Sequence, residues 1–126
     1  MKYWIDKQEQ YVVFQLQEER LDTAIAPLLK SQFVTMNAEG VRNFILDLGH
    51  VGYADSSGLS ALLVANRLCK ESKGILVLTR LQPAVEKLIQ ISQLQNVLNI
   101  LPSVEEGVDA VFMHEIEAGL EDNTDR

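Results

Sequence analysis

The stretch that decides the fold is NFILDLGHVGYADSSGLSALL, residues 43–63. Residues 43–48 form a nearly continuous apolar run, which is typical of an internal strand covered on much of its surface. The loop GHVGYAD follows, and a helix is predicted from about Ser56 to Glu71, with Gly74 ending it. The apolar side of this helix is predicted to hold Leu59, Leu62, Leu63, Asn66 and Cys69. A buried strand leading through a short loop into an amphipathic helix is the building unit of α/β proteins.

The residues before this stretch predict two strands and one helix. The segments YWI (3–5) and YVVFQL (11–16) are rich in β-branched and aromatic residues, and the polar DKQEQ between them indicates a turn. An amphipathic helix is predicted over residues 23–40 from apolar residues at three- and four-residue spacing: Ile25, Leu28, Leu29, Phe33 and Met36. Asp22 or Thr23 is its expected cap, Pro27 suits its first turn, and Gly40 is its expected stop.

The residues after this stretch continue the alternation of strands and helices. The segment ILVLT (75–79) predicts a strand, PAVEKLIQI a helix, and VLNIL (97–101) a last short strand. Ser103 and Glu106 have the spacing of a capping box, so a closing helix should follow. Its expected apolar stripe consists of Val104, Val108, Val111, Phe112 and Ile116. The predicted order is ββαβαβαβα, a mixed and mostly parallel sheet with helices, in which the first hairpin is antiparallel.

Length and composition indicate a single domain. The chain has 126 residues, of which 47% are hydrophobic and 23% charged, as in an ordinary globular domain. We expect the domain at residues 1–118 and an acidic flexible tail at residues 119–126. The formal net charge of −7 argues against direct nucleic-acid binding and against an anionic membrane surface, because both repel an acidic protein.

The single cysteine and the N-terminal residues bear on the location of the protein. One cysteine cannot form an internal disulfide or a cysteine-based zinc site, so Cys69 is predicted to lie in or near the core. Residues 1–10 lack the uninterrupted apolar stretch of a signal peptide, and no apolar run approaches the roughly 20 residues of a membrane span. We therefore expect a cytoplasmic protein without membrane insertion.

The DSSG sequence at residues 55–58 allows both a structural and a chemical interpretation. Asp and Ser are favoured N-cap residues, so Asp55 and Ser56 can simply mark the start of a helix. Loops after strands are also where open α/β sheets place functional groups, and a helix N-terminus favours an anion. Gly58 in the first turn would let another backbone come close. These residues alone leave both interpretations open.

Three kinds of catalytic or cofactor site lack the residues they need. The pattern Ala54-x-Ser56-x-Gly58 is similar to the serine elbow of hydrolases, but His50 lies close before the serine and His114 falls in the closing helix. A phospho-aspartate receiver needs clustered acids at strand ends, whereas the first strands here end in isoleucine and leucine. The sequence has no GxGxxG or Walker motif. We therefore expect no metal, no cofactor and no enzymatic activity.

Residues 43–63 closely resemble the central signature of STAS domains of the anti-sigma factor antagonist type. That signature is an apolar strand ending in Asp-Leu, a short loop, Asp-Ser-Ser/Thr-Gly-Leu and an apolar helix. The segment GILVLTRLQPAVEKLIQISQLQNVLNIL (74–101) is similar to the family's strand, proline-started helix and final strand, and ERLDTAIAPLL (19–29) resembles its early Leu-Asp helix start. The resemblance covers almost the whole chain and implies a single STAS-like α/β domain. The family commonly has Gly-Glu-Leu-Asp where this chain has Glu19-Arg20-Leu21-Asp22, so contacts near that loop, including any to a nucleotide, are not carried over.

The resemblance implies that Ser56 is phosphorylated by an anti-sigma factor that is also a serine/threonine kinase, with Asp55 as its acidic neighbour. The other motif and partner-contact residues would be Tyr53, Ser57, Gly58 and Leu59. The unphosphorylated protein would bind the kinase and release a sigma factor, phosphorylation would disfavour binding, and a serine phosphatase would reset the switch. The alternative is a constitutive scaffold or transporter-associated STAS module, in which the motif only caps a helix.

Overall fold

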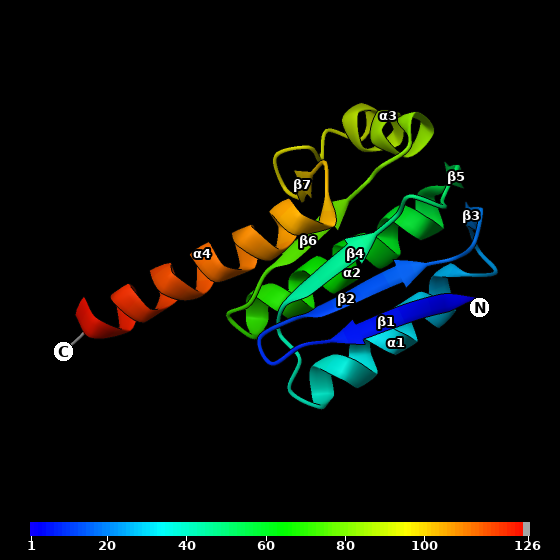
Figure 1. Ribbon diagram of the computed structural model, residues 1–126. Coiled ribbons are helices and arrows are strands. Elements are labelled where there is room, and N and C mark those ends of the chain that lie inside the picture. Colours follow the sequence, from blue (N-terminus) through cyan, green and yellow to red (C-terminus); the bar gives the residue numbers. More distant parts are fainter. Residues whose placement is uncertain (125–126) are drawn as a thin grey trace.

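A mixed sheet of five strands forms the middle of the structure (Figure 1). The computed structural model describes residues 1–124, with side chains described over residues 1–120. In spatial order the strands are β1 (Tyr3–Lys7), β2 (Val12–Leu16), β4 (Phe44–Asp47), β6 (Leu76–Thr79) and β7 (Asn99–Leu101). The hairpin of β1 and β2 is antiparallel, and the other neighbours are parallel. The predicted α/β class with a mixed, mostly parallel sheet is confirmed.

Helices cover both faces of this sheet. The helices α1 (Ala26–Ala38) and α2 (Ser56–Glu71) pack side by side on one face, and α4 (Val104–Thr124) crosses the other. Successive strand residues point to opposite faces, so Phe14 and Leu46 enter the larger core under α1 and α2. Val13 and Ile45 enter a smaller core that includes Val111 of α4. The remaining helix, α3 (Pro83–Ile91), contributes to the larger core.

Two short strands form a second sheet that the sequence did not predict. They are β3 (Arg20–Leu21) and β5 (Tyr53–Ala54), which pair in parallel with Arg20 opposite Tyr53 and Leu21 opposite Ala54. The predicted order ββαβαβαβα is therefore correct for the other elements and lacks these two. Because each strand has two residues, neither shows the alternation of apolar and polar residues by which a strand is recognised.

Helix α1 begins later than its sequence pattern suggested. Its N-cap residue is Ile25, which makes no side-chain cap hydrogen bond, so the expected cap at Asp22 or Thr23 was wrong. The carboxylate of Asp22 instead accepts hydrogen bonds from the backbone N–H groups of Ala24 (3.0 Å) and Ile25 (3.3 Å) in the turn before the helix. Pro27 lies in the first turn, as predicted. The stop at Gly40 is confirmed by its φ of 105°, a left-handed conformation that favours glycine.

The buried side of α1 is narrower than predicted. Leu29, Phe33 and Met36 are buried, whereas Leu28 is 47% exposed, so its assignment to the apolar side was wrong. The helix turns about 100° per residue, and Leu28 points to solvent because it lies off the buried stripe, which consists of Ala26, Leu29, Phe33 and Met36.

Helix α2 has the predicted bounds but ends in a different way. The left-handed residue after it is Lys73, with φ 63°, rather than Gly74. The Gly74 N–H donates to the Cys69 carbonyl oxygen at 2.7 Å and so completes the helix end. A side chain at position 74 would lie 1.8 Å from the carbonyl oxygen of Arg42. The glycine is therefore required by close backbone packing and not by its φ angle.

Helix α4 is longer than the predicted closing helix. The Ser103 hydroxyl accepts the N–H of Glu106 at 3.2 Å, which confirms the serine half of the capping box. Val111 is buried, whereas Phe112 and Ile116 are 43% and 57% exposed, so the expected apolar stripe is not buried along its whole length. The helix extends through Thr124 and thus includes most of the segment 119–126. The flexibility expected for that segment stays a prediction, and residues 125–126 lie outside the described residues.

Candidate functional site

Asp55 caps the N-terminus of α2. Its backbone is extended, with φ −113° and ψ −171°, and its carboxylate oxygen accepts the N–H groups of Ser57 at 2.9 Å and Gly58 at 3.1 Å. One aspartate therefore satisfies two of the N–H groups that a helix start leaves unpaired. In the part of the chain that the structure describes, no hydrogen bond engages the hydroxyl of Ser56 or Ser57. The capping interpretation thus explains Asp55 and leaves both serines unexplained.

Burial distinguishes the two serines. Ser56 is the first residue of α2 and is exposed, whereas Ser57 is half-buried. Gly58 and Leu59 are buried, and Leu59 belongs to the larger core. An enzyme acting on this motif would therefore reach the Ser56 hydroxyl first.

Gly58 is required by the second sheet. A Cβ atom at this position would lie 2.4 Å from the carbonyl oxygen of Leu21 in β3. That oxygen also accepts the N–H of Asp55 at 3.3 Å. The strand β3 therefore packs directly on the first turn of α2, which confirms the close backbone approach expected of this glycine.

The exposed side chains of Arg20 and Tyr53 and the half-buried carboxylate of Asp22 lie beside the α2 start. The pairing of β3 with β5 places the Arg20 guanidinium 4.1 Å from the centre of the Tyr53 ring, within the range of a cation–π contact. Arg20 Nε also lies 3.4 Å from a carboxylate oxygen of Asp22. Partial burial raises the pKa of Asp22, but the N–H groups of Ala24 and Ile25 and the Arg20 charge outweigh it and hold that pKa below its ordinary value.

Sequence reasoning identified Tyr53 but missed Arg20. No local pattern marks Arg20, because only the pairing of β3 with β5 brings it against Tyr53.

A shallow groove between the starts of α1 and α2 adds a cation to the site. It has a volume of about 370 Å³ and is lined by Thr23, Ala26, Pro27, Lys30, Ser56, Ser57 and Ser60. Lys30 comes from α1 and was not singled out from the sequence. Only the packing of α1 on α2 brings it into the same groove as Ser56.

A polar network holds the loop that leads to Tyr53. The nearly buried carboxylate of Asp47 accepts hydrogen bonds from the Gly49 N–H at 2.9 Å, from Gln15 at 3.0 Å and from Arg80 at 3.0 Å. Gln82 donates to the Gly49 carbonyl oxygen at 2.7 Å. Asp47 is therefore engaged in positioning the loop. Within residues 1–120, whose side chains are described, no group of three or more potential metal-ligating side chains is found.

The second histidine lies far from Ser56. The His114 Nε2 atom is 3.0 Å from the carbonyl oxygen of Lys73, just after the C-terminal end of α2. Ser56 lies at the opposite end of this helix of 16 residues, which is about 24 Å long. The arrangement therefore does not place His114 as the base of a serine hydrolase.

Comparison with known proteins identifies the family. The family model of the STAS domain matches residues 3–107, so the chain belongs to the STAS domain family. A curated relative is BtrV of Bordetella bronchiseptica, a candidate anti-sigma factor antagonist, which is 30% identical over 105 residues, or 83% of this chain and 90% of BtrV. Its similarity extends the family assignment to the anti-sigma factor antagonists.

Solved structures share the fold with this chain. The anti-sigma factor antagonist SpoIIAA in its unphosphorylated form matches with a TM-score of 0.69 at 21% identity, over 87% of this chain and 97% of SpoIIAA. The phosphorylated form from Bacillus gives 0.68 at 23% identity, over 87% and 99%. A sulfate transporter family protein from Wolinella succinogenes gives 0.73 at 15% identity, over 85% and 88%. No helix within residues 1–124 has the length and apolar character needed to cross a membrane.

Proposed function

We propose that this protein is an anti-sigma factor antagonist whose binding to an anti-sigma kinase is controlled by phosphorylation of Ser56. The observation that carries the proposal is the exposed Ser56 hydroxyl at the first position of α2, in a chain that belongs to the STAS family. The capping function is already supplied by Asp55. Ser56 is therefore available for a modification that leaves the helix cap in place.

The docking surface consists of Tyr53 with Arg20, the exposed Ser56 and the exposed side of α2. Tyr53 is 41% exposed, and its ring is held by Arg20. Aromatic residues and arginine are enriched among residues that dominate binding energy in interfaces. Unphosphorylated, this surface binds the kinase and frees a sigma factor.

Phosphorylation of Ser56 changes charge without requiring a change of fold. It adds about −1.5 to −2 charge at neutral pH, next to the Asp55 carboxylate and on a chain with a net charge of −7. Within the molecule, Lys30 in the groove offsets part of this charge. A kinase surface that fits a neutral serine has no positive charge placed to offset the added phosphate charge. The similar TM-scores to the two forms of SpoIIAA, 0.69 and 0.68, support a switch that retains the fold.

The switch requires only a modest change in the free energy of binding to the kinase. A loss of roughly 3 kcal/mol in binding free energy lowers affinity more than a hundredfold. Repulsion between a phosphoryl group and an acidic or desolvated surface is sufficient for a loss of this size. The protein is then a kinase substrate and not an enzyme. It acts in the cytoplasm without direct contact to nucleic acid, without inserting into a membrane and without a cofactor, and a serine phosphatase resets it.

Binding of four variants to the cognate kinase tests the proposal. Ser56→Ala should bind like the unmodified protein and resist phosphorylation, whereas Ser56→Asp should bind at least tenfold more weakly. Ser57→Ala should remain a substrate. Ser31→Asp adds the same charge at an exposed residue of α1 outside the docking surface and controls for a general effect of charge. If Ser56→Asp binds like the unmodified protein, or if Ser31→Asp weakens binding equally, a switch at Ser56 is refuted.

The second candidate function is a constitutive STAS module. The match to a sulfate transporter family protein favours it, because the same fold occurs there. In that case Ser56→Asp is harmless and no phosphate is present on Ser56. Intact-mass measurement with phosphosite mapping on protein from its own cells distinguishes the two functions.

A further inference from the structure

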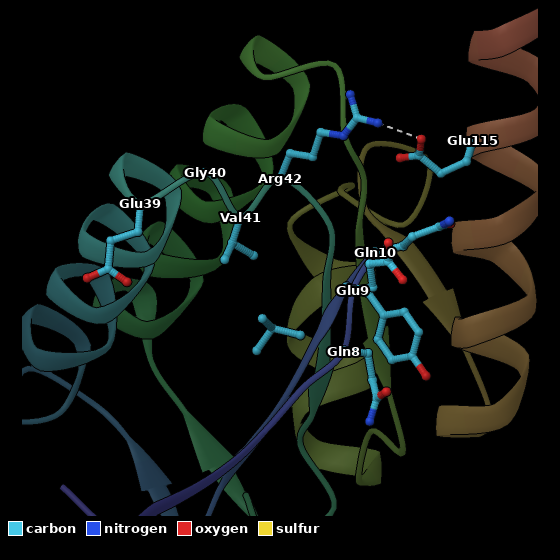
Figure 2. A pocket seen from close by; sticks show the side chains of 10 residues that line it. Gln8, Glu9, Gln10, Glu39, Gly40, Val41, Arg42 and Glu115 are labelled. Carbon is cyan, nitrogen blue, oxygen red and sulfur yellow. Dashed lines mark hydrogen bonds and ion pairs between the residues drawn. The ribbon is translucent and has the colours of Figure 1, made fainter.

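The second half of α4 extends beyond the body of the domain (Figure 1). Among the described side chains, the last hydrogen bonds and ion pairs between α4 and the body come from two neighbouring residues. His114 lies 3.0 Å from the Lys73 carbonyl oxygen, and Glu115 pairs with Arg42 and accepts a hydrogen bond from Asn43 at 2.7 Å. Figure 2 shows the ion pair of Arg42 and Glu115 where α4 passes the end of the sheet. From there the helix continues to Thr124 without the sheet beneath it.

This projecting half and the turn just before it carry apolar side chains in solvent. Phe112, Ile116 and Leu120 are 43%, 57% and 59% exposed and follow each other at a spacing of four residues, which places them along one side of the helix. Met113, 56% exposed, widens the stripe. Exposed apolar residues that form a contiguous patch mark interaction sites more often than singly scattered ones do. We refer to these four residues as the α4 stripe.

Acidic residues surround the α4 stripe. The 21 residues of α4 include seven acidic residues and neither lysine nor arginine. At the N-terminal end of the stripe, the rings of Phe112 and Tyr11 are nearly perpendicular, with 6.1 Å between their centroids. Tyr11 also lines a cavity of about 360 Å³, together with Glu9, Glu39 and Glu115 (Figure 2). The apolar patch therefore continues into a cavity whose polar lining is rich in carboxylates.

The charge of α4 identifies the kind of surface that can cover the stripe. A second copy of this chain would bring two acidic helices together, and an anionic bilayer would repel the same helix. An amphipathic helix laid into an apolar groove uses anchors at this spacing. We propose that the α4 stripe docks in the apolar groove of a partner protein, and that lysine and arginine residues border that groove.

This surface is separate from the proposed Ser56 surface. Ser56 lies at the N-terminal end of α2, on the face of the sheet that α1 covers, whereas α4 lies on the opposite face. The projecting half of α4 also passes the other end of α2, near Lys73. Both surfaces can therefore be occupied at once, and the proposal does not depend on the switch at Ser56.

Site-specific cross-linking in the source cells tests the proposal with the full chain. A photoreactive amino acid is incorporated at position 116, and at position 91 as a control, since Ile91 is a 68% exposed isoleucine outside α4. We expect a protein cross-linked from position 116 and not from position 91, with the cross-link mapping to a groove bordered by basic residues. Cross-links to no protein, to a second copy of this chain or to lipid alone would overturn the proposal.

The affinity of the purified pair gives the quantitative test. Ile116→Glu should weaken binding at least tenfold, whereas Ile91→Glu should leave it within twofold. Both side chains are exposed, so circular dichroism should show folded protein for each variant. Raising the salt concentration should weaken binding of the unchanged protein, because screening reduces the attraction between acidic α4 and a basic rim. Equal affinities of the two variants, or binding that is independent of salt, would contradict the proposal.

Discussion

A Cβ atom on Gly58 would lie 2.4 Å from the carbonyl oxygen of Leu21. This contact joins the first turn of α2 to β3, and β3 in turn holds Arg20 against Tyr53. We expect Gly58→Ala to lower the free energy of unfolding by about 1–3 kcal/mol, the usual cost of overpacking. This range is the net effect: alanine has a higher helix propensity than glycine, which compensates about 1 kcal/mol of the steric strain. Urea unfolding measures the change, and kinase binding should weaken with it.

Gly119→Ala is the matched control for this prediction. Gly119 also lies in a helix, but no atom lies within 4 Å of the position its Cβ would take. This variant should be as stable as the original chain or up to about 1 kcal/mol more stable. If Gly58→Ala were equally harmless, the close packing of β3 on α2 would not constrain residue 58.

Two substitutions of Asp55, the cap residue of α2, distinguish its structural role from a role in recognition by the kinase. Asp55→Ala removes the acceptor of two backbone hydrogen bonds and should cost about 1 kcal/mol of stability. Asp55→Asn keeps a good cap and should change stability by only a few tenths of a kcal/mol. Thermal unfolding measures both. An asparagine variant that is stable but a poor kinase substrate would show that the charge of Asp55 contributes to recognition, whereas normal phosphorylation would limit Asp55 to capping.

Most elements of the fold could be predicted because their patterns are local. The run over residues 43–48 and the apolar spacing over residues 56–71 each extend over several residues, so β4 and α2 were found at nearly correct bounds. The strands β3 and β5 form only by pairing with each other across more than thirty residues of chain. Two residues carry no periodic signal, so their existence follows from tertiary contacts alone.

The candidate site was predictable to the extent that it lies in one segment. Tyr53, Asp55 and Ser56 come from the continuous motif, whereas Arg20 and Lys30 reach it from β3 and α1. The exposed stripe on α4 has a related cause. Helical spacing identified Phe112 and Ile116 as apolar positions of the helix but not Met113 or Leu120, and the end of the sheet decides that Val111 is buried and Ile116 is not.

The end of α2 yields a pair of opposite predictions at neighbouring residues. Lys73 has a φ of 63°, so Lys73→Gly should relieve left-handed strain and raise stability by about 0.5–1 kcal/mol. Gly74→Ala should be strongly destabilising, because its Cβ would lie 1.8 Å from the Arg42 carbonyl oxygen. Urea unfolding of the two variants provides the measurement. If Lys73→Gly instead lost stability, the greater conformational entropy of glycine in the unfolded chain would outweigh the relief of backbone strain in the folded chain.

Burial of Cys69 predicts a loss of stability in alkaline solution. Burial raises the pKa of the Cys69 thiol from an ordinary value near 9 to about 12, although a backbone hydrogen bond with Phe44 acts in the opposite direction. The folded chain therefore holds the thiol proton at a pH where the unfolded chain loses it. The stabilising contribution is complete below pH 9 and decreases as the pH rises from 9 toward 12. At pH 10 the decrease is about 1.4 kcal/mol relative to pH 7.

Cys69→Ala isolates this effect from the titration of tyrosine and lysine, which both chains share. The variant should be less stable at pH 7, because a buried side chain has been shortened. Its free energy of unfolding should nevertheless fall less steeply between pH 8 and pH 10 than that of the original chain. The native thiol should also react slowly with a disulfide reagent at pH 8 and rapidly in urea, since the thiolate is the nucleophile. Parallel pH profiles for the two proteins, together with rapid native labelling, would mean that Cys69 ionises in the folded chain.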